Sequence, residues 1–374
     1  MNKKTKLLYF VNTDWFFISH RLPIALAALK KGYEVHIVVN EATKINELKK
    51  YGILVHFLKL NRKNWNPIEF LNCLLKFIFL IKKINPDLIH CLTIKPIIIG
   101  TLSSIILIKP KVVISITGMG SIFSNNKKID KIKQLFILGI YSFIFLKKNL
   151  KVIFQNNDDQ LLIINKTTLK RDKSLIIRGS GVNFKNYPYK YLKDKKPKVL
   201  FASRLLYSKG IKEFIEASSF VKECEFLVAG NIDPGNPQSI TKKDLNLFIK
   251  NYPIKYLGFK KNIVNTITSS SIIVLPSYYR EGLPKILIEA AACGRAIITT
   301  DNVGCRDAVI NDKTGILIPI KNTQKLVQAI KYLLKDKKYL TKMGERGRKF
   351  AKENFDISII VDKHLKIYEE LILK

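Results

Sequence analysis

The chain alternates short apolar runs rich in β-branched residues with segments of helical pattern, and this series occurs twice. In the first half the runs are Leu7–Asn12, Glu34–Val39, Leu54–Leu60, Leu88–Thr93, Val112–Thr117 and Lys151–Asn156. In the second half they are Lys198–Ser203, Glu225–Gly230, Ile254–Phe259, Ser271–Ser277, Ala296–Thr300 and Gly315–Pro319. Nearly continuous apolar strands between helices indicate parallel sheets that are covered on both faces. The sequence therefore predicts an α/β protein built on two parallel sheets.

A polar, lysine-rich segment separates the two series. Tyr187–Lys198 contains two prolines and is the strongest linker signal in the chain. A length of 374 residues is also long for one core. We therefore predict a first domain over residues 1–190, a second over 191–355, and a closing helix over 356–374 that could pack back on the first domain. Two such sheets would leave a crevice between the carboxyl ends of their strands, where ligands bind.

The charge and the cysteines limit the partners and the compartment. A net charge of +36 favours an anionic partner such as a membrane surface, nucleic acid or a phosphorylated ligand. The alternative is compositional, because lysine, asparagine and isoleucine are over-used together and much of the charge would then be solvated lysine. The five cysteines form no C-x-x-C pair, which fits the reducing cytosol and indicates neither a disulfide framework nor a zinc site.

Three long apolar stretches raise the question of membrane contact. Phe70–Ile81, Pro96–Ile108 and Gln134–Leu146 are each shorter than the ~20 residues that a membrane-spanning helix needs. The third stretch is bracketed by basic residues, namely Lys127, Lys128, Lys131, Lys133, Lys147, Lys148 and Lys151. This pattern suits a helix that lies on an anionic leaflet. A core helix with solvated ends explains it equally well.

The stretch Tyr278–Thr300 contains Glu281 and Glu289 among mainly apolar residues. Buried carboxylates are costly unless they bind something. Pro284 suits the first position of a helix, so Glu281 falls on the loop after a strand and Glu289 in the first turns of the helix. Gly282 lets the backbone approach a ligand, and the helix start offers N–H groups to a phosphate. Carboxylates instead accept hydrogen bonds from hydroxyls, so the combination predicts a nucleotide sugar.

A second segment, Phe201–Gly210, follows the first strand of the second half. Arg204 and Lys209 stand there at a strand-to-helix junction and could neutralise a diphosphate leaving group. A solvated Lys209 is the alternative, because lysine is abundant throughout the chain.

Several motifs together resemble a known enzyme family. E-G-L-P-K-I-L-I-E, S-R-L-L-Y-S-K-G and the segment Asn302–Pro319 are similar to the E-x7-E signature, the phosphate-binding segment and the closing segment of retaining glycosyltransferase family 4, whose members adopt the GT-B fold of two Rossmann-like domains. In the first half, His20–Ala25, Thr93–Pro96, Thr117–Phe123 and Phe154–Asp159 look like bacterial enzymes that build O-antigen, capsule or glycan on polyprenyl-diphosphate carriers. The resemblance covers nearly the whole chain.

The resemblance implies roles for particular residues. Glu281, Arg204 and Lys209 would be catalytic, with Glu281 on the donor sugar and the two cations on the diphosphate, and the donor-binding set would be Glu289, Gly282, Leu283, Gly230 and Phe259. Acceptor or sugar contacts would fall on His20, His90 and Gly118, although a buried structural histidine is an equal alternative for His90. Neither a metal nor a cofactor is expected. The bulky loop Asp14–Ser19 suggests an acceptor with a lipid part, and ordinary aromatic packing explains it too.

The expected activity is therefore the retaining, metal-independent transfer of a hexose or N-acetylhexosamine from a UDP-sugar to a polyprenyl-diphosphate-linked saccharide. Such an enzyme would be cytoplasmic and held peripherally at the anionic inner face of the cytoplasmic membrane. A UDP-sugar epimerase of similar two-domain shape is the alternative, and the E-x7-E and S-R-L segments argue against it. A nucleic-acid-binding protein has only the charge in its favour, because no recognition motif is present, so no nucleic-acid partner is expected.

Overall fold

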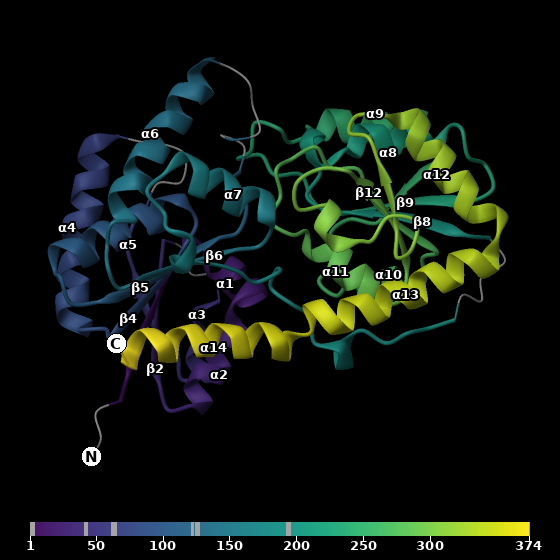
Figure 1. Ribbon diagram of the computed structural model, residues 1–374. Helices are drawn as coiled ribbons and strands as arrows, with labels where there is room; N and C mark the ends of the chain where they lie inside the picture. The colour runs from purple at the N-terminus through teal and green to yellow at the C-terminus, as the bar shows by residue number, and fades with distance from the viewer. Residues whose placement is uncertain are drawn as a thin grey trace. The chain divides into compact units, whose positions relative to one another are not determined.

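The computed structural model describes residues 4–40, 44–60, 66–120, 123, 128–191 and 196–373. The chain forms two compact units, the first from Met1–Ser180 with Ser358–Lys374 and the second from Gly181–Ile357. Each unit is a parallel sheet with helices on both faces (Figure 1). The predicted α/β class with two Rossmann-like domains is thereby confirmed.

The sheet of the first unit has the order β3-β2-β1-β4-β5-β6-β7 within the described ranges, and all its pairings are parallel. Its strands are β1 Lys6–Phe10, β2 Glu34–Val39, β3 Leu54–Phe57, β4 Leu88–Leu92, β5 Lys111–Ile116, β6 Leu150–Phe154 and β7 Ser174–Ile176. Successive side chains of a strand point to opposite faces, so each central strand contributes to two separate packing layers.

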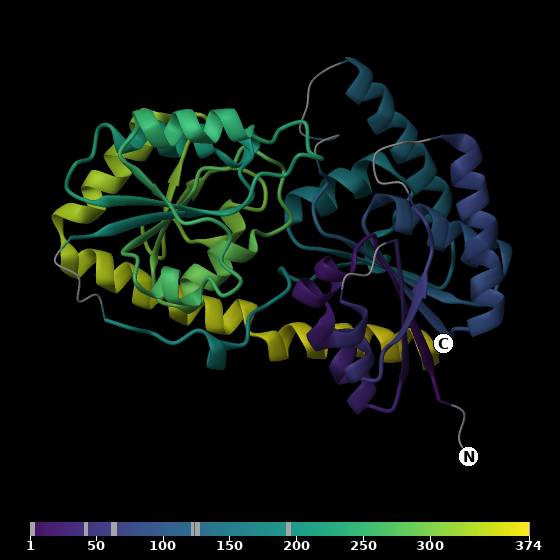
Figure 2. The same ribbon diagram turned by 180° about the vertical axis from the view of Figure 1, so that it is seen from behind.

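Helices cover both faces of this sheet (Figures 1 and 2). Leu8 and Phe10 pack in one core cluster with residues of α4 Pro67–Ile84, α5 Ile94–Ile106 and α6 Lys128–Ile144. Tyr9 points to the other face, where its hydroxyl lies 3.1 Å from the Tyr368 hydroxyl of α14 Ile357–Leu373. The closing helix is thus part of the first unit. The remaining helices of this unit are α1 Asp14–His20, α2 Leu22–Lys30, α3 Ile45–Lys50 and α7 Asn157–Lys166.

The sheet of the second unit has the order β10-β9-β8-β11-β12-β13 in the part of the chain that the structure describes. Its strands are β8 Lys198–Ala202, β9 Glu225–Ala229, β10 Ile254–Tyr256, β11 Ile272–Leu275, β12 Ala296–Thr300 and β13 Ile316–Ile318. Its helices are α8 Ile211–Ser218, α9 Lys242–Asn251, α10 Val264–Thr268, α11 Lys285–Ala292, α12 Thr323–Lys335 and α13 Lys337–Phe355. The strand order reverses its direction between β8 and β11, which are hydrogen-bonded neighbours, so their carboxyl ends form the switch point where such sheets bind ligands.

Two local predictions differ from the structure. The segment Asp14–Ser19, predicted as a loop, forms α1, in which Phe17 is buried and Phe16 stacks on His20 with ring centroids 4.5 Å apart. Residues four apart meet in this way because they lie on one face of a helix. The prediction missed the helix because three consecutive aromatic residues show no helical period.

The boundary between the units also lies earlier than residue 190. Val182 donates its N–H to the Phe355 carbonyl at 2.9 Å, and its own carbonyl accepts from Ile357 at 3.0 Å. Further along, Arg348 donates to the Tyr187 carbonyl at 2.7 Å. These bonds attach the first part of the predicted linker to the second unit. Residues 192–195 of that linker lie outside the described residues, and the predicted crevice between the two sheets stays a prediction.

Candidate active site

The site begins at the loop that joins β11 to α11. Glu281 lies on this loop with only 8% of its surface exposed. Lys209 donates from Nζ to Glu281 Oε1, and the Ser277 hydroxyl donates to the same oxygen at 2.9 Å. A carboxylate that is buried away from water needs such a cation, because an unpaired buried charge is strongly unfavourable. The structure therefore joins two residues that the sequence placed in one site from separate motifs.

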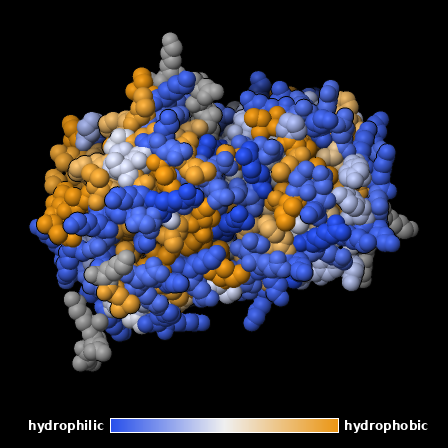
Figure 3. Space-filling view, viewed as in Figure 1, coloured by the Kyte–Doolittle hydropathy of each residue, from blue (hydrophilic) through white to orange (hydrophobic). Residues whose placement is uncertain are grey.

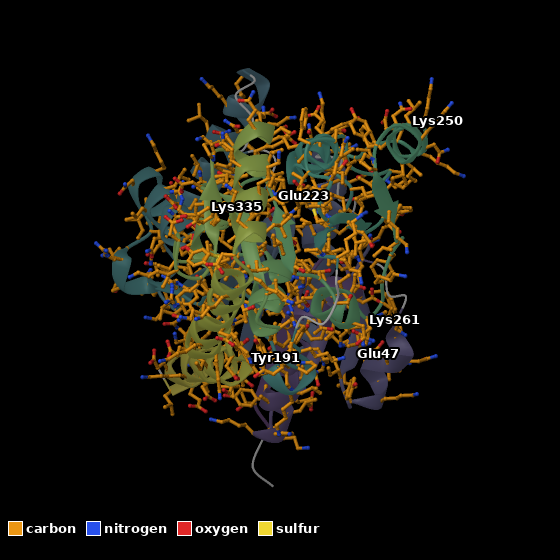
Figure 4. The ribbon with its side chains drawn as sticks, turned by 90° about the vertical axis from the view of Figure 1, so that its right-hand side faces the viewer. Glu47, Tyr191, Glu223, Lys250, Lys261 and Lys335 are labelled. Carbon is orange, nitrogen blue, oxygen red and sulfur yellow. The ribbon has the colours of Figure 1, made fainter. Side chains whose placement is uncertain are left out.

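Lys209 differs from the abundant surface lysines of the chain. Lys250 and Lys335 of the second unit are exposed, and Figure 4 shows Lys250 at the edge of the molecule. Lys209 is only 8% exposed, and its Nζ also lies 5.3 Å from the centre of the Tyr279 ring, a cation–π distance. The alternative of a solvated Lys209 is therefore wrong.

Backbone contacts hold the loops after β8 and β11 together. The Ser208 carbonyl accepts from the N–H groups of Tyr278 and Tyr279, both at 3.0 Å. Gly210 adopts φ +76°, and a Cβ there would collide with the carbonyl of Pro276. Only glycine allows this left-handed turn and this close approach. The lysine and the glutamate are therefore positioned by two loops that cannot move apart without breaking backbone bonds.

A third loop, which follows β12, packs against the backbone of Glu281 and Gly282. Gly304 has φ +78°, and a Cβ there would lie 2.5 Å from the carbonyl oxygens of both Glu281 and Gly282. Asn302 donates from its side-chain nitrogen to the Tyr279 carbonyl at 3.0 Å. Sequence reasoning did not assign a role to Gly304, although a glycine among the motif residues was the available signal.

Glu289 lies inside α11, eight residues after Glu281 in the sequence. It is 9% exposed and accepts a hydrogen bond from the Tyr187 hydroxyl at 2.8 Å, while Lys285 Nζ lies 3.9 Å from the same oxygen. Burial raises the pKa of Glu289, and Lys285 and the Tyr187 hydrogen bond act in the opposite direction. Tyr187 was missed because the sequence placed it in a linker.

The start of α11 is close to the prediction. The helix begins at Lys285 with Pro284 as its N-cap residue, one position later than predicted. Gly282 and Leu283 therefore precede the first helical turn, and Leu283 is 8% exposed as part of the core of the second unit. Both residues thus lie on the loop at the amino end of α11.

Arg204 and the residues assigned to the base pocket lie at the ends of the neighbouring strands. Arg204 is nearly half exposed and its guanidinium pairs with Asp233 at 2.8 Å, whereas Lys209 pairs with Glu281. Gly230 has φ +144°, and a Cβ would collide with the Ser203 carbonyl. Phe259 is 67% exposed. Asp233 is a partner that the sequence analysis did not single out.

The candidate histidines of the first unit form hydrogen bonds with residues that are not candidates, whereas the lysine and the glutamate of the second unit bond to each other. His90 is fully buried, with its Nδ1 2.7 Å from the Tyr368 hydroxyl and its Nε2 2.7 Å from the Ser115 hydroxyl. Burial lowers its pKa well below the ordinary value. Both ring nitrogens are thus used inside the protein, which corresponds to the structural alternative for His90. His20 ends α1, its Nδ1 3.2 Å from the Phe16 carbonyl.

The other positions of the first unit add two observations. Gly118 follows β5 with φ +118°, a conformation that favours glycine. Ser121 and Ile122 of the same motif lie outside the described residues. Arg21, which the sequence analysis missed, is 1% exposed and donates to the His20 carbonyl at 3.0 Å. In the described ranges no three histidine, cysteine or acidic residues lie close enough to hold a metal ion, and the expected metal independence stays a prediction.

Two parallel α/β units, one of which carries a buried lysine–glutamate pair at its switch point, define a protein of the GT-B class. Solved structures agree on the fold. A glycosyltransferase from Rickettsia africae matches with a TM-score of 0.80 at 23% identity, covering 99% of both chains. Anabaena Alr3699/HepE, solved in complex with UDP and glucose, matches with a TM-score of 0.80 at 17% identity, covering 98% of this chain and 99% of that one.

The family follows from the sequence matches. Residues 6–156 match the family described as glycosyl transferase 4-like, and residues 183–350 match glycosyl transferases group 1. The two matches together span most of the chain, which is therefore a glycosyltransferase with one domain of each kind. The predicted resemblance is confirmed, and the glycosyltransferase interpretation is favoured over the epimerase alternative.

Two curated relatives align over nearly their whole length. One is the N,N'-diacetylbacillosaminyl-diphospho-undecaprenol alpha-1,3-N-acetylgalactosaminyltransferase of Campylobacter jejuni, 29% identical over 378 residues that cover 95% of this chain and 98% of the relative. The other is the UDP-Gal:alpha-D-GlcNAc-diphosphoundecaprenol alpha-1,3-galactosyltransferase of Escherichia coli, 23% identical with coverage of 91% and 90%.

Proposed function

We propose that this glycosyltransferase moves a hexose or N-acetylhexosamine from a UDP-sugar to a saccharide linked to a polyprenyl diphosphate, with retention of the anomeric configuration. The observation that carries the proposal is the buried pair of Lys209 and Glu281 at the carboxyl ends of β8 and β11. The pair presents a cation for phosphate and a carboxylate for hydroxyls at the position where parallel sheets bind ligands.

The donor would be held by groups on the loops of the second unit. The Lys209 ammonium has three N–H donors, and only one of them is used in the hydrogen bond to Glu281. The ammonium can therefore still donate to a diphosphate oxygen. Arg204 would add a second cation, because its guanidinium offers more donors than the one used by Asp233. The N–H groups of Gly282 and Leu283 would complete the phosphate site at the start of α11.

The two carboxylates would bind the two sugars of the donor. Glu281 would accept from hydroxyls of the transferred sugar, and Glu289 would accept from the ribose hydroxyls. Tyr187 keeps the Glu289 carboxylate in one orientation through its 2.8 Å hydrogen bond. Gly230 and Phe259 would lie beside the base. Support for a UDP donor comes from the Escherichia coli relative, whose name specifies UDP-Gal, and from the Anabaena structure, which contains UDP.

The proposed chemical step is a substitution on one face of the sugar. The bond between the anomeric carbon and the phosphate oxygen of UDP breaks, and a bond to the acceptor oxygen forms on the same side. The acceptor proton passes to the departing phosphate oxygen, so UDP leaves carrying that proton. Lys209 and Arg204 would stabilise the negative charge that develops on the phosphate, and Glu281 would fix the sugar ring as positive charge develops on it. No metal or cofactor enters this scheme.

The acceptor would bind through the first unit and bring the enzyme to the membrane. Both curated relatives described above are named for acceptors that carry a sugar on diphospho-undecaprenol. We therefore place the enzyme in the cytoplasm, peripherally associated with the inner face of the cytoplasmic membrane, where His20 and Gly118 are candidate contacts of the acceptor.

Nucleotide binding and product analysis test the proposal. Thermal shift and calorimetry with a panel of nucleoside diphosphates should show selective binding of UDP. The replacements Glu281→Ala and Arg204→Ala should each lower turnover by ~10²-fold or more, as removal of a preorganised charged group does. Arg346→Ala, at an exposed position of α13, serves as the matched control.

Three outcomes would contradict the proposal. Near-normal turnover in both folded variants would refute the assigned roles. A product of inverted configuration by NMR would refute retention. Epimerisation of the donor in the absence of any acceptor would instead support the alternative activity.

A further inference from the structure

The helix α4 has an apolar face on each side. Its inward side packs in the core of the first unit through Cys73, Phe77 and Ile81. Its outward side carries Ile68, Leu71, Leu75 and Phe79, which recur three or four residues apart and are between 55% and 79% exposed. A helix that covers a sheet normally turns polar residues outward. This second stripe therefore has no role in the folding of the unit.

The helix α6 repeats the pattern. Ile137, Tyr141 and Ile144 are buried, whereas Ile132, Leu135, Phe136 and Phe143 are between 55% and 70% exposed. The helix therefore covers the core and also presents an apolar outer face, and its contact with an anionic leaflet stays a prediction. Lys127 and the side chain of Lys128 lie outside the described residues.

The carboxyl ends of α4, α5 and α6 are tied to one another. Lys109, which follows α5, donates to the Asn85 side chain at the end of α4 at 2.6 Å. Lys147, which follows α6, donates to the Ser104 carbonyl of α5 at 3.2 Å. The outward stripes of α4 and α6 are therefore parts of one helical layer. Figure 3 shows apolar side chains gathered on the side of the molecule where α4 and α5 lie in Figure 1.

The tip of α5 adds a strained apolar residue to this layer. Ile108 is 83% exposed and has φ +63°, a left-handed conformation that is unfavourable for a β-branched side chain. Ile106, two residues earlier, is 57% exposed. An exposed isoleucine in a strained turn stabilises nothing within the unit.

Lysines accompany the apolar stripes. On α4 the exposed Lys76, Lys82 and Lys83 outnumber Glu69. On α6 the exposed Lys131 and Lys133 outnumber Asp130. Large apolar side chains flanked by lysines are typical of helices that lie in the interface of a bilayer with anionic lipids. A second copy of this chain would bring the same lysines and would be repelled.

We propose that the outward side of α4 and α6, together with Ile106 and Ile108, is a docking face for a bilayer that contains anionic phospholipid. The apolar side chains would enter the boundary between headgroups and acyl chains, and the lysines would contact lipid phosphates. This inference deepens the proposed function, since it rests on a lipid-linked acceptor and names the surface that would bring the enzyme to it. No helix in the described part of the chain is long and apolar enough to cross a membrane.

Flotation of the full chain with vesicles tests the docking face. Wild-type protein is mixed with vesicles of phosphatidylcholine alone or of phosphatidylcholine and phosphatidylglycerol, in the absence of any nucleotide or acceptor. The docking variant carries Leu75→Gln, Phe79→Gln, Leu135→Gln and Phe136→Gln. The matched control carries Phe220→Gln, Leu247→Gln and Tyr332→Gln, which replace exposed apolar residues of the second unit.

Wild-type protein should float with the anionic vesicles and remain in solution with the neutral ones. The docking variant should lose at least about tenfold in partitioning, because each large apolar side chain removed from the bilayer interface weakens binding severalfold. Replacing Lys82 and Lys83 by glutamine in the otherwise wild-type protein should lower its partitioning onto anionic vesicles by roughly fivefold per lysine at low salt. The control should bind as wild type does. Circular dichroism of each variant verifies that it is folded.

Wild-type protein that stays in solution with anionic vesicles would overturn the proposal, as would equal binding by the docking variant and wild type. A dimer in light scattering that the docking variant abolishes, without vesicle binding by wild type, would assign the face to a second copy instead. Calorimetry with UDP on the same samples separates the two proposals, because loss of UDP binding bears only on the proposed function and the vesicles contain no substrate.

Discussion

Breaking the buried pair of Lys209 and Glu281 from one side should destabilise the second unit far more than removing both partners. In Lys209→Met the carboxylate keeps its desolvated position and loses its cation. In Glu281→Met the ammonium is left without its carboxylate. In the double variant two unbranched apolar side chains fill the same space and neither charge remains. The comparison therefore isolates the charges from the volume.

The magnitude follows from the burial of both groups. Each residue is 8% exposed, so solvent screens the pair little. Removing one partner of a buried ion pair costs about 3–5 kcal/mol, whereas replacing both by apolar residues is close to neutral. The Ser277 hydroxyl remains as a donor to Glu281, so we expect about 3 kcal/mol for Lys209→Met. With a urea dependence of about 1–3 kcal/mol/M, the unfolding midpoint should fall by roughly 1–3 M.

The cysteines allow each unit to be followed separately. All five are buried, with Cys73 and Cys91 in the first unit and Cys224, Cys293 and Cys305 in the second. A short pulse of thiol reagent at each urea concentration, followed by mass spectrometry of peptides, reports the unfolding of each unit. Labelling in the second unit should shift in the single variants and labelling in the first should not.

The double variant decides the interpretation. Its midpoint for Cys293 and Cys305 should return to within roughly 0.5 M of wild type, because no uncompensated charge is left. Midpoint shifts of the two single variants that simply add in the double variant would show that Lys209 and Glu281 contribute independently. That result would refute the reasoning, and with it the view that the pair is a single preorganised element.

The remaining predictions concern other parts of the two units. Tyr187→Phe should raise the dissociation constant for UDP by roughly tenfold in calorimetry, because Glu289 loses a hydrogen bond to a charged group, and an unchanged constant would contradict its proposed ribose contact. Gly304→Ala should destabilise the second unit by about 2 kcal/mol or more in the thiol-pulse assay, since its Cβ would meet the Glu281 carbonyl at φ +78°, and a midpoint equal to wild type would show that the loop relaxes freely. Burial lowers the pKa of His364 to about 3 from 6.5, so its contribution to the packing of α14 is complete above pH 6.5 and is lost as the pH falls. Hydrogen exchange of α14 should therefore show that the free energy of unfolding falls by about 2 kcal/mol between pH 6.5 and 5. The replacement His364→Phe should abolish this fall.

The sequence predicted the order and type of the elements because buried parallel strands have a local signature. Each strand from β1 to β6 and from β8 to β13 overlaps an apolar run that the sequence alone reveals. Pairing across the sheet is not local. The bond between Lys209 and Glu281 joins residues 72 positions apart, and each was selected only because it belongs to a recognisable motif. Tyr187 and Asp233 belong to no such motif, so their contacts with Glu289 and Arg204 could not be anticipated.

The buried charges of the two units have different physical consequences. The second unit has a continuous apolar core, and an ion pair within it contributes less than well-packed apolar side chains of the same volume would. Under the proposed function the pair has a reason to persist, because a donor diphosphate can take over the Lys209 ammonium while sugar hydroxyls satisfy Glu281. Each charge then exchanges one partner for another, so neither is a buried charge without a partner at any stage of binding. Arg21 in the first unit is also buried, but its guanidinium donates to a carbonyl rather than to a carboxylate. It therefore lacks the complementary charge that such an exchange requires.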